Sequence, residues 1–192
     1  MIKIKDYFSE AQWQKFLSAA VEHETPFLLV DLSLIKQKFE EMVMYFPNAK
    51  IHYAMKANPG VPVINLLRDL GSNFDCASIF ELDRVFDSGV TPDRVSYGNT
   101  IKKAAHIKYA YDKGVRLYAT DSKADIQKIA ENAPGSRVFV RILVEGGDTA
   151  EWPLSRKFGC HPDMAIDLLV NAKKLGLEPY GISFHVGSQQ KD

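Results

Sequence analysis

A regular recurrence of strand-like segments is the feature that most constrains the fold of this chain. Runs rich in apolar and β-branched residues begin near Lys50, Ser72, Arg94, Val115 and Arg137, spaced by about 22 residues. That spacing suits a minimal unit of strand, loop, helix and loop. A sixth strand is expected after a longer interval. The predicted strands are 50–56, 73–77, 95–97, 116–120, 138–144 and 181–186.

Helix-start and helix-end signals fill the intervals between these strands. Ser78 and Glu81 form a capping-box pattern, in which Ser78 accepts from the first turn and Glu81 reaches back. Asp121-Ser122 and Pro162 suit the first turns of two further helices. Helix-closing glycines stand at equivalent places, namely Gly71, Gly89, Gly114 and Gly176. The chain is therefore expected to be an α/β protein.

Two elements precede the repeats. Ser9 and Gln12 can cap a first helix with an apolar face, and residues 25–30 read as a strand outside the repeat. Ser33 is expected to start a second helix. The expected organisation is an N-terminal helix and strand (1–32) followed by a β/α body (33–192), with no linker that splits the chain into independent domains.

Composition excludes several functional classes. Twenty-four Lys plus Arg balance twenty-four Asp plus Glu, so no net field draws the chain to nucleic acid or to an anionic membrane. With no charged-then-apolar leader and no long apolar run, we expect a cytoplasmic protein. Cys76 and Cys160 fit a reducing compartment and lack zinc-site spacing, so no metal site is expected. The expected partner is a small molecule or another protein.

Parallel β/α units leave two main architectures, the closed eight-stranded barrel and the open doubly wound sheet, and the regular spacing favours the barrel. Both place ligands at the carboxyl ends of the strands. The polar residues expected at that edge are Lys56, Asp75, Asn99, Asp121, Arg141 and His185. Because these polar residues are expected at one edge, we predict a ligand-binding site there.

Each residue at this edge also has a purely structural interpretation. Lys56 could simply point into water, and Asp75 could cap the helix that follows it. Arg141 could pair with Glu145 or Asp148 at the surface, and His185 could be a hydrogen-bonded structural residue.

The chemistry of the edge residues favours a carbonyl-binding site. Asn58-Pro59-Gly60 ends the first strand just after Lys56, which places an amine at the strand end. Partial desolvation would favour the neutral amine, which can condense with a carbonyl group. Gly187 and Ser188 follow His185 and suit a close approach to phosphate oxygens. The long segment 145–160 is expected to be a lid or binding loop.

Four ordered motifs carry a family resemblance: Tyr-Ala-Met-Lys-Ala-Asn-Pro at 53–59, Phe-Asp-Cys-Ala-Ser at 74–78 with Glu81, Lys-Phe-Gly at 157–159 and Phe-His-Val-Gly-Ser at 184–188. Together they resemble the ornithine/lysine/diaminopimelate decarboxylases, pyridoxal-phosphate enzymes with an alanine-racemase-like TIM-type (β/α)8 barrel. The second motif looks most like the ornithine decarboxylase branch.

The resemblance implies roles for five residues. Lys56 would hold pyridoxal 5'-phosphate as a Schiff base, His185 would stack against its ring, and Ser188 would help to hold its phosphate. Asp75 and Arg141 match positions that line the cofactor cleft. The implied reaction is decarboxylation of ornithine or lysine to a diamine, as in polyamine biosynthesis, by a homodimer with shared active sites. Diaminopimelate decarboxylation, racemisation and a non-catalytic homologue that binds a regulatory protein remain alternatives.

The sequence also departs from the family pattern. Relatives are about twice as long, and a closed barrel needs eight strands. About six are expected here, so the barrel is incomplete, and strand 25–30 would belong to an absent C-terminal β-domain. The family's glycine-rich phosphate loop, its carboxylate for the pyridine nitrogen and its second-subunit cysteine and aspartate are also missing. We therefore expect little activity from this chain alone, and an open sheet edge that another segment or chain covers.

Overall fold

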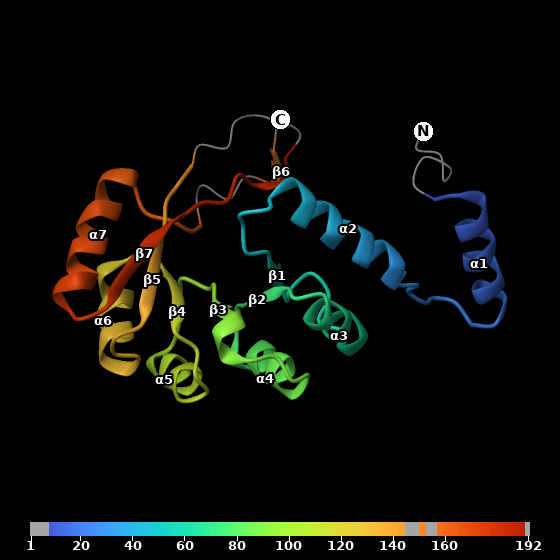
Figure 1. Cartoon of the computed structure of the whole chain (residues 1–192). Helices are drawn as coiled ribbons and strands as arrows, with labels where there is room; N and C mark the ends of the chain where they lie inside the picture. The colour runs from blue at the N-terminus through green and yellow to red at the C-terminus, as the bar shows by residue number, and fades with distance from the viewer. Residues whose placement is uncertain (1–7, 145–149, 153–156, 191–192) are drawn as a thin grey trace.

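Six parallel strands form one sheet in a computed structural model of the chain (Figure 1), which describes residues 8–144, 150–152 and 157–190. Each strand of this sheet pairs with the sheet's next strand in chain order, so the sheet order is β1-β2-β3-β4-β5-β7. The strands are β1 (His52–Ala54), β2 (Asn73–Cys76), β3 (Val95–Tyr97), β4 (Leu117–Thr120), β5 (Arg137–Arg141) and β7 (Glu178–Ser183).

Helices connect these strands and lie along one side of the sheet (Figure 1). They are α3 (Val61–Asp69), α4 (Ile79–Asp87), α5 (Ala104–Asp112), α6 (Lys123–Asn132) and α7 (Pro162–Lys174), with a 3-10 turn η2 (Pro92–Arg94) before β3. A doubly wound sheet reverses its strand order and carries helices on both faces. The sequential order and the one-sided helices instead make this the incomplete TIM-type (β/α) barrel that the sequence predicts.

The hydrophobic core lies between the helices and the outer face of the sheet. Alternate strand residues point outward, so Phe74 and Cys76 of β2 are buried whereas Asn73 and Asp75 are only half-buried. Tyr118, Val138 and Val140 continue this outer layer on the next strands, and apolar side chains of the helices pack against it. The inner face is thereby left free for polar side chains.

Most predicted helix ends are confirmed. Ser122 is the N-cap of α6 and accepts from the Asp125 amide at 3.3 Å. Ser78 caps α4, but Glu81 reaches the amide of Ala77 at 2.6 Å, one residue before the cap. The four predicted closing glycines follow their helices with positive φ angles of 79° to 98°. Within the described ranges, every helix is too short or too polar to cross a membrane.

The N-terminal region differs from expectation. Helix α1 (Glu10–Val21) has the reciprocal Ser9–Gln12 capping box that the sequence predicts. Residues 25–30 do not form a strand, because no described segment pairs with their backbone. Helix α2 (Leu32–Tyr45) starts before Ser33, since Asp31 is the N-cap and accepts from the Ser33 amide at 2.8 Å.

The first and last strands of the sheet are shorter or shifted relative to prediction. β1 ends at Ala54, because the Ala57 amide donates to the Ala54 carbonyl at 3.0 Å and turns the chain. β7 begins at Glu178 and ends at Ser183, so His185 lies just beyond it. Two short strands, β6 (Ala150–Trp152) and β8 (Ser188–Gln190), form a separate antiparallel pair that was not predicted. Most of the expected lid, at 145–149 and 153–156, lies outside the described residues.

A buried ion cluster joins β3, β4 and α6. The Lys102 ammonium is 2.7 Å from the Asp125 carboxylate and also donates to the carbonyls of Asn99 and Ala119, at 2.8 and 2.6 Å. The two side chains are only 0% and 4% exposed. Lys128 lies 3.3 Å from the other oxygen of Asp125. This cluster fixes the loop that leaves the carboxyl end of β3.

We expect Lys102→Met to lower the free energy of unfolding by about 3 kcal/mol or more, measured by urea denaturation. The substitution leaves Asp125 buried with a single cation and removes the donor to two carbonyls. Lys108→Met is the matched control, since Lys108 forms only an exposed pair with Asp112 at 3.0 Å. Equal stability of Lys102→Met and the wild-type chain would contradict the structural role of the cluster.

Candidate active site

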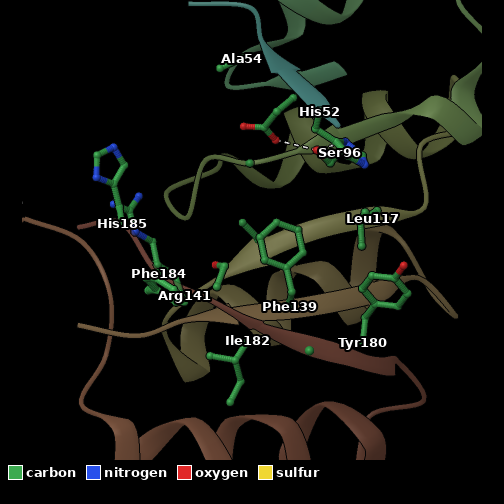
Figure 2. A pocket seen from close by; sticks show the side chains of 15 residues that line it. His52, Ala54, Ser96, Leu117, Phe139, Arg141, Tyr180, Ile182, Phe184 and His185 are labelled. Atoms are coloured by element: carbon green, nitrogen blue, oxygen red, sulfur yellow. Dashed lines mark hydrogen bonds between the residues drawn. The ribbon is translucent and has the colours of Figure 1, made fainter. Parts of the chain in front are cut away.

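A cavity of about 510 Å³ lies on the inner face of the sheet. Figure 2 shows the side chains of 15 residues that line it, and they come from every strand of the sheet. The polar side chains among them are His52, Asp75, Ser96, Arg141, Tyr180, Ser183 and His185. Three of the five predicted site residues, Asp75, Arg141 and His185, therefore line one cavity.

Asp75 is the carboxylate of this cavity. The hydroxyl of Ser96 donates to its Oδ1 at 2.6 Å, the hydrogen bond drawn in Figure 2. Burial raises the pKa of Asp75, whereas the Ser96 hydrogen bond and the positive charges of Lys56 and Arg141 lower it. A half-buried carboxylate that faces two cations can act as their common counter-charge.

Gly98 makes room for this carboxylate. A Cβ atom at Gly98 would lie 2.2 Å from Oδ1 and 2.3 Å from Oδ2 of Asp75. No side chain fits there while Asp75 keeps its position, so the carboxylate is seated against bare backbone.

Arg141 ends β5, and the segment 157–160 packs beside it. Its guanidinium lies 5.1 Å from the centre of the Phe158 ring. Burial lowers the pKa of Arg141, while the negative charges of Asp121 and Asp75 raise it. Glu145 and Asp148, the surface partners considered from the sequence, lie outside the described residues. Arg141 therefore presents its charge to the cavity.

Hydrogen bonds hold the Lys-Phe-Gly motif at the carboxyl ends of β4 and β5. The Gly159 amide donates to the Asp121 carboxylate at 3.0 Å, and the Cys160 amide donates to the Arg141 carbonyl at 2.9 Å. Gly159 has a φ of +96°, and a Cβ there would lie 2.8 Å from the Ile142 carbonyl. Asp121 thus anchors this segment rather than lining the cavity.

Lys56 lies on the turn that follows β1, and its position is fixed by that turn. Tyr53 donates to the Asn58 carbonyl at 3.2 Å, and Asn58 accepts from the Gly60 amide at 3.0 Å. The expected partial desolvation of Lys56 is wrong for this chain, because its side chain is exposed and no described segment covers it. Its charge still lowers the pKa of both Asp75 and His185.

His185 follows β7, and Figure 2 shows it beside Arg141. Its Nδ1 accepts from the Gly187 amide at 2.9 Å, which fixes the ring and places the hydrogen of the neutral imidazole on Nε2. Burial lowers the pKa of His185, and the charges of Arg141 and Lys56 lower it further. The imidazole is therefore neutral at pH 7. Ser188, in contrast, is exposed on β8 and does not line the cavity.

Most of the cavity lining was not predicted, including the polar residues His52, Ser96, Tyr180 and Ser183 and the glycine Gly98. His52 lies four residues before Lys56, so the period of two along a strand could have placed it on the same face. His52 stands two residues before Ala54 on β1, and Ser96 is the register partner of Asp75. Ser96 and Gly98 could not be found in this way, because the predicted Asn99 has the opposite parity and the register between strands is not set by local sequence.

The seat at Gly98 yields a stability test. We expect Gly98→Ala to lower the free energy of unfolding by about 1–3 kcal/mol in urea denaturation, because the new methyl group displaces the Asp75 carboxylate. Gly181→Ala is the control, since Gly181 lines the same cavity and a Cβ there meets nothing within 4 Å. An equal loss of stability in both variants would show that the close approach of Asp75 to Gly98 does not determine the effect of the substitution on the free energy of unfolding.

The chain resembles known decarboxylases in sequence and in structure. Residues 32–192 match the family model described as "Pyridoxal-dependent decarboxylase, pyridoxal binding domain". Ornithine decarboxylase of Saccharomyces cerevisiae is 41% identical over 169 residues, which are 88% of this chain and 36% of the yeast enzyme. Antizyme inhibitor 2 of Xenopus laevis is 35% identical over 167 residues, 87% of this chain and 36% of that protein.

The fold also matches that of an enzyme of known structure. The crystal structure of lysine decarboxylase from Selenomonas ruminantium superposes with a TM-score of 0.84 at 38% identity, over 95% of this chain and 47% of that one. The chain thus spans less than half the length of these relatives. The family resemblance carried by the four motifs is confirmed, and the chain belongs to the pyridoxal-dependent decarboxylases, in which it corresponds to the pyridoxal-binding domain.

Proposed function

We propose that the protein decarboxylates a basic amino acid, ornithine or lysine, to a diamine in polyamine biosynthesis, with pyridoxal phosphate held on Lys56. One observation carries the proposal. An amine, a guanidinium and an imidazole stand around a half-buried carboxylate at the carboxyl edge of the sheet. Since the chain spans under half of its relatives, we propose that it contributes the cofactor-binding part and has little activity alone.

The residues of the cavity fit the chemistry of pyridoxal phosphate. The exposed amine of Lys56 is accessible to an aldehyde. Arg141 offers a positive charge to an anionic group, and the fixed ring of His185 offers a flat surface to an aromatic ring. When bound, the cofactor supplies the electron sink that accepts the pair left by the departing carbon dioxide.

The protein groups then have distinct tasks in this proposal. Lys56 is the attachment point. The neutral His185 would pack against the ring without adding charge, because its pKa is lowered. Asp75 offsets the positive charges of Lys56 and Arg141, so that the two cations can lie at the same edge of the sheet. The contact of Ser188 with the phosphate is proposed from the family motif alone.

A specific relative supports a second candidate function. The name of the Xenopus protein refers to inhibition of another protein, antizyme, so the fold also occurs in proteins named for an effect on a protein partner. A non-catalytic role in binding a regulatory protein is therefore the alternative from a different class. Diaminopimelate decarboxylation and racemisation are the alternatives that retain the cofactor.

We also propose the finer assignments that the sequence suggests. These are a cytoplasmic location, no nucleic-acid or membrane partner, and a homodimer with shared active sites in the full-length protein. The balanced charge supports the absence of a nucleic-acid or membrane partner, and the free thiols of Cys76 and Cys160 support the location. The division into 1–32 and 33–192 is supported by the start of the family match at residue 32.

The cofactor site is tested by adding pyridoxal phosphate, recording absorbance near ~420 nm, reducing with borohydride and mapping the labelled peptide. We expect the label on Lys56 and its loss in Lys56→Ala. Lys50→Ala is the matched control, because Lys50 is also exposed but lies before β1, at the opposite end of the strand. Lys50→Ala should label as the wild-type chain does.

The outcomes separate the candidate functions. A band that forms only in a full-length protein would mean that the site needs the remaining half of the barrel. The absence of a band in both would reject the enzyme and favour the protein-binding alternative. With the cofactor bound, release of carbon dioxide from ornithine, lysine or diaminopimelate identifies the substrate.

A further inference from the structure

Three adjacent strands each contribute one polar side chain to the cavity on the inner face. β1 contributes His52, β2 contributes Asp75 and β3 contributes Ser96. Asp75 and Ser96 are register partners, whereas Asp75 pairs with Ala54, two residues beyond His52. These three side chains therefore form a polar row, which starts with Asp75 near the carboxyl edge of the sheet and ends with His52, one layer deeper.

Ser96 is the central residue of this polar row. Its Oγ lies 2.6 Å from Asp75 Oδ1 and 3.4 Å from His52 Nδ1, and the residue is only 4% exposed. A hydroxyl has a single hydrogen, and the short distance to a carboxylate oxygen assigns that hydrogen to Asp75. The Ser96 oxygen can then accept a hydrogen from His52 in the tautomer that carries its hydrogen on Nδ1, and the Phe74 backbone is a second hydrogen-bond partner of this ring.

The remaining groups around Asp75 do not duplicate the task of Ser96. Lys56 and Arg141 act on it as charges from the turn after β1 and from β5, and Glu81 of α4 opposes them. His52 is neutral, because burial lowers its pKa, so it provides a hydrogen bond and no charge. Among the described residues, the side-chain hydrogen bond to the Asp75 carboxylate comes from Ser96.

We propose that Ser96 and His52 are positioning residues, which hold Asp75 as an ionised carboxylate at the carboxyl edge of the sheet, within the electrostatic influence of Lys56 and Arg141. Ser96 donates directly to the carboxylate, and His52 fixes the rotation of the Ser96 hydroxyl. Gly98 completes the arrangement, because the carboxylate rests where a Cβ would otherwise lie. The use of this charge in the cofactor site rests on the proposed function, whereas the control of Asp75 by Ser96 does not.

The test is an NMR titration of the 192-residue chain labelled with ¹³C at the aspartate carboxyl groups, without cofactor. Asp75→Asn identifies the Asp75 signal by its disappearance. We expect Ser96→Ala to raise the pKa of Asp75 by about one unit, because the ionised form loses its hydrogen bond. Ser96→Thr keeps the hydroxyl and should restore the wild-type titration. His52→Phe should give a smaller rise, since the hydroxyl remains.

A matched control separates this effect from the loss of any buried hydroxyl. Ser136 is 0% exposed, and its hydroxyl has no hydrogen-bond partner among the described residues. Ser136→Ala should leave the titration of Asp75 unchanged. A folded Ser96→Ala chain in which Asp75 titrates as in the wild type would overturn the proposal.

A second variant covers the case in which Ser96→Ala does not fold. Ser96→Cys is close in size but a weak donor, so it should also raise the pKa of Asp75. A wild-type titration in that variant would overturn the proposal as well. Labelling of Lys56 by the cofactor is a separate readout, so failure of the proposed function is distinguishable from failure of this inference.

Discussion

The alternation of side chains along parallel strands is the constraint on which the rest of the structure depends. One face of each strand must be apolar, because the helices pack on it and exclude water from residues such as Phe74, Tyr118 and Val140. Among the residues that the structure describes, no helix lies above the other face, which can therefore carry polar groups. Core and candidate site are therefore two faces of the same short strands, and their residues alternate in the sequence.

Asp75 shows what this arrangement makes possible. A carboxylate on the inner face would normally be disfavoured as it leaves water, and burial does raise its pKa. The structure offsets this with a hydroxyl from the adjacent strand, with two cations at the edge, and with a glycine that leaves space. These compensations come from several β/α units, with Ser96 and Gly98 from β3 and the residue after it, Lys56 from the turn after β1 and Arg141 from β5. The site is therefore a property of the assembled sheet and not of any one motif.

The sequence was most informative where structure is local. The repeat spacing predicted the strand order, and caps such as Ser9 and Ser122 were readable because their partners lie within three residues. The edge residues Asp75, Arg141 and His185 followed from the predicted ends of the strands.

The features that could not be predicted depend on contacts between distant segments. The β6–β8 pair joins residues far apart in the chain, and the exposure of Lys56 depends on what covers it. Strand 25–30 failed for the same reason, since a strand needs a partner that local sequence does not specify.

Backbone hydrogen bonds next to Arg141 join the two ends of the loop that follows β5. The Leu143 amide donates to the Cys160 carbonyl at 2.8 Å, and the Cys160 amide donates to the Arg141 carbonyl at 2.9 Å. With Asp121 bound to Gly159, these bonds close the base of the loop independently of its length. Related chains can therefore gain or lose residues between 144 and 157 while the guanidinium stays in place. This part of the molecule can diverge to suit different substrates or partners around an unchanged anchor.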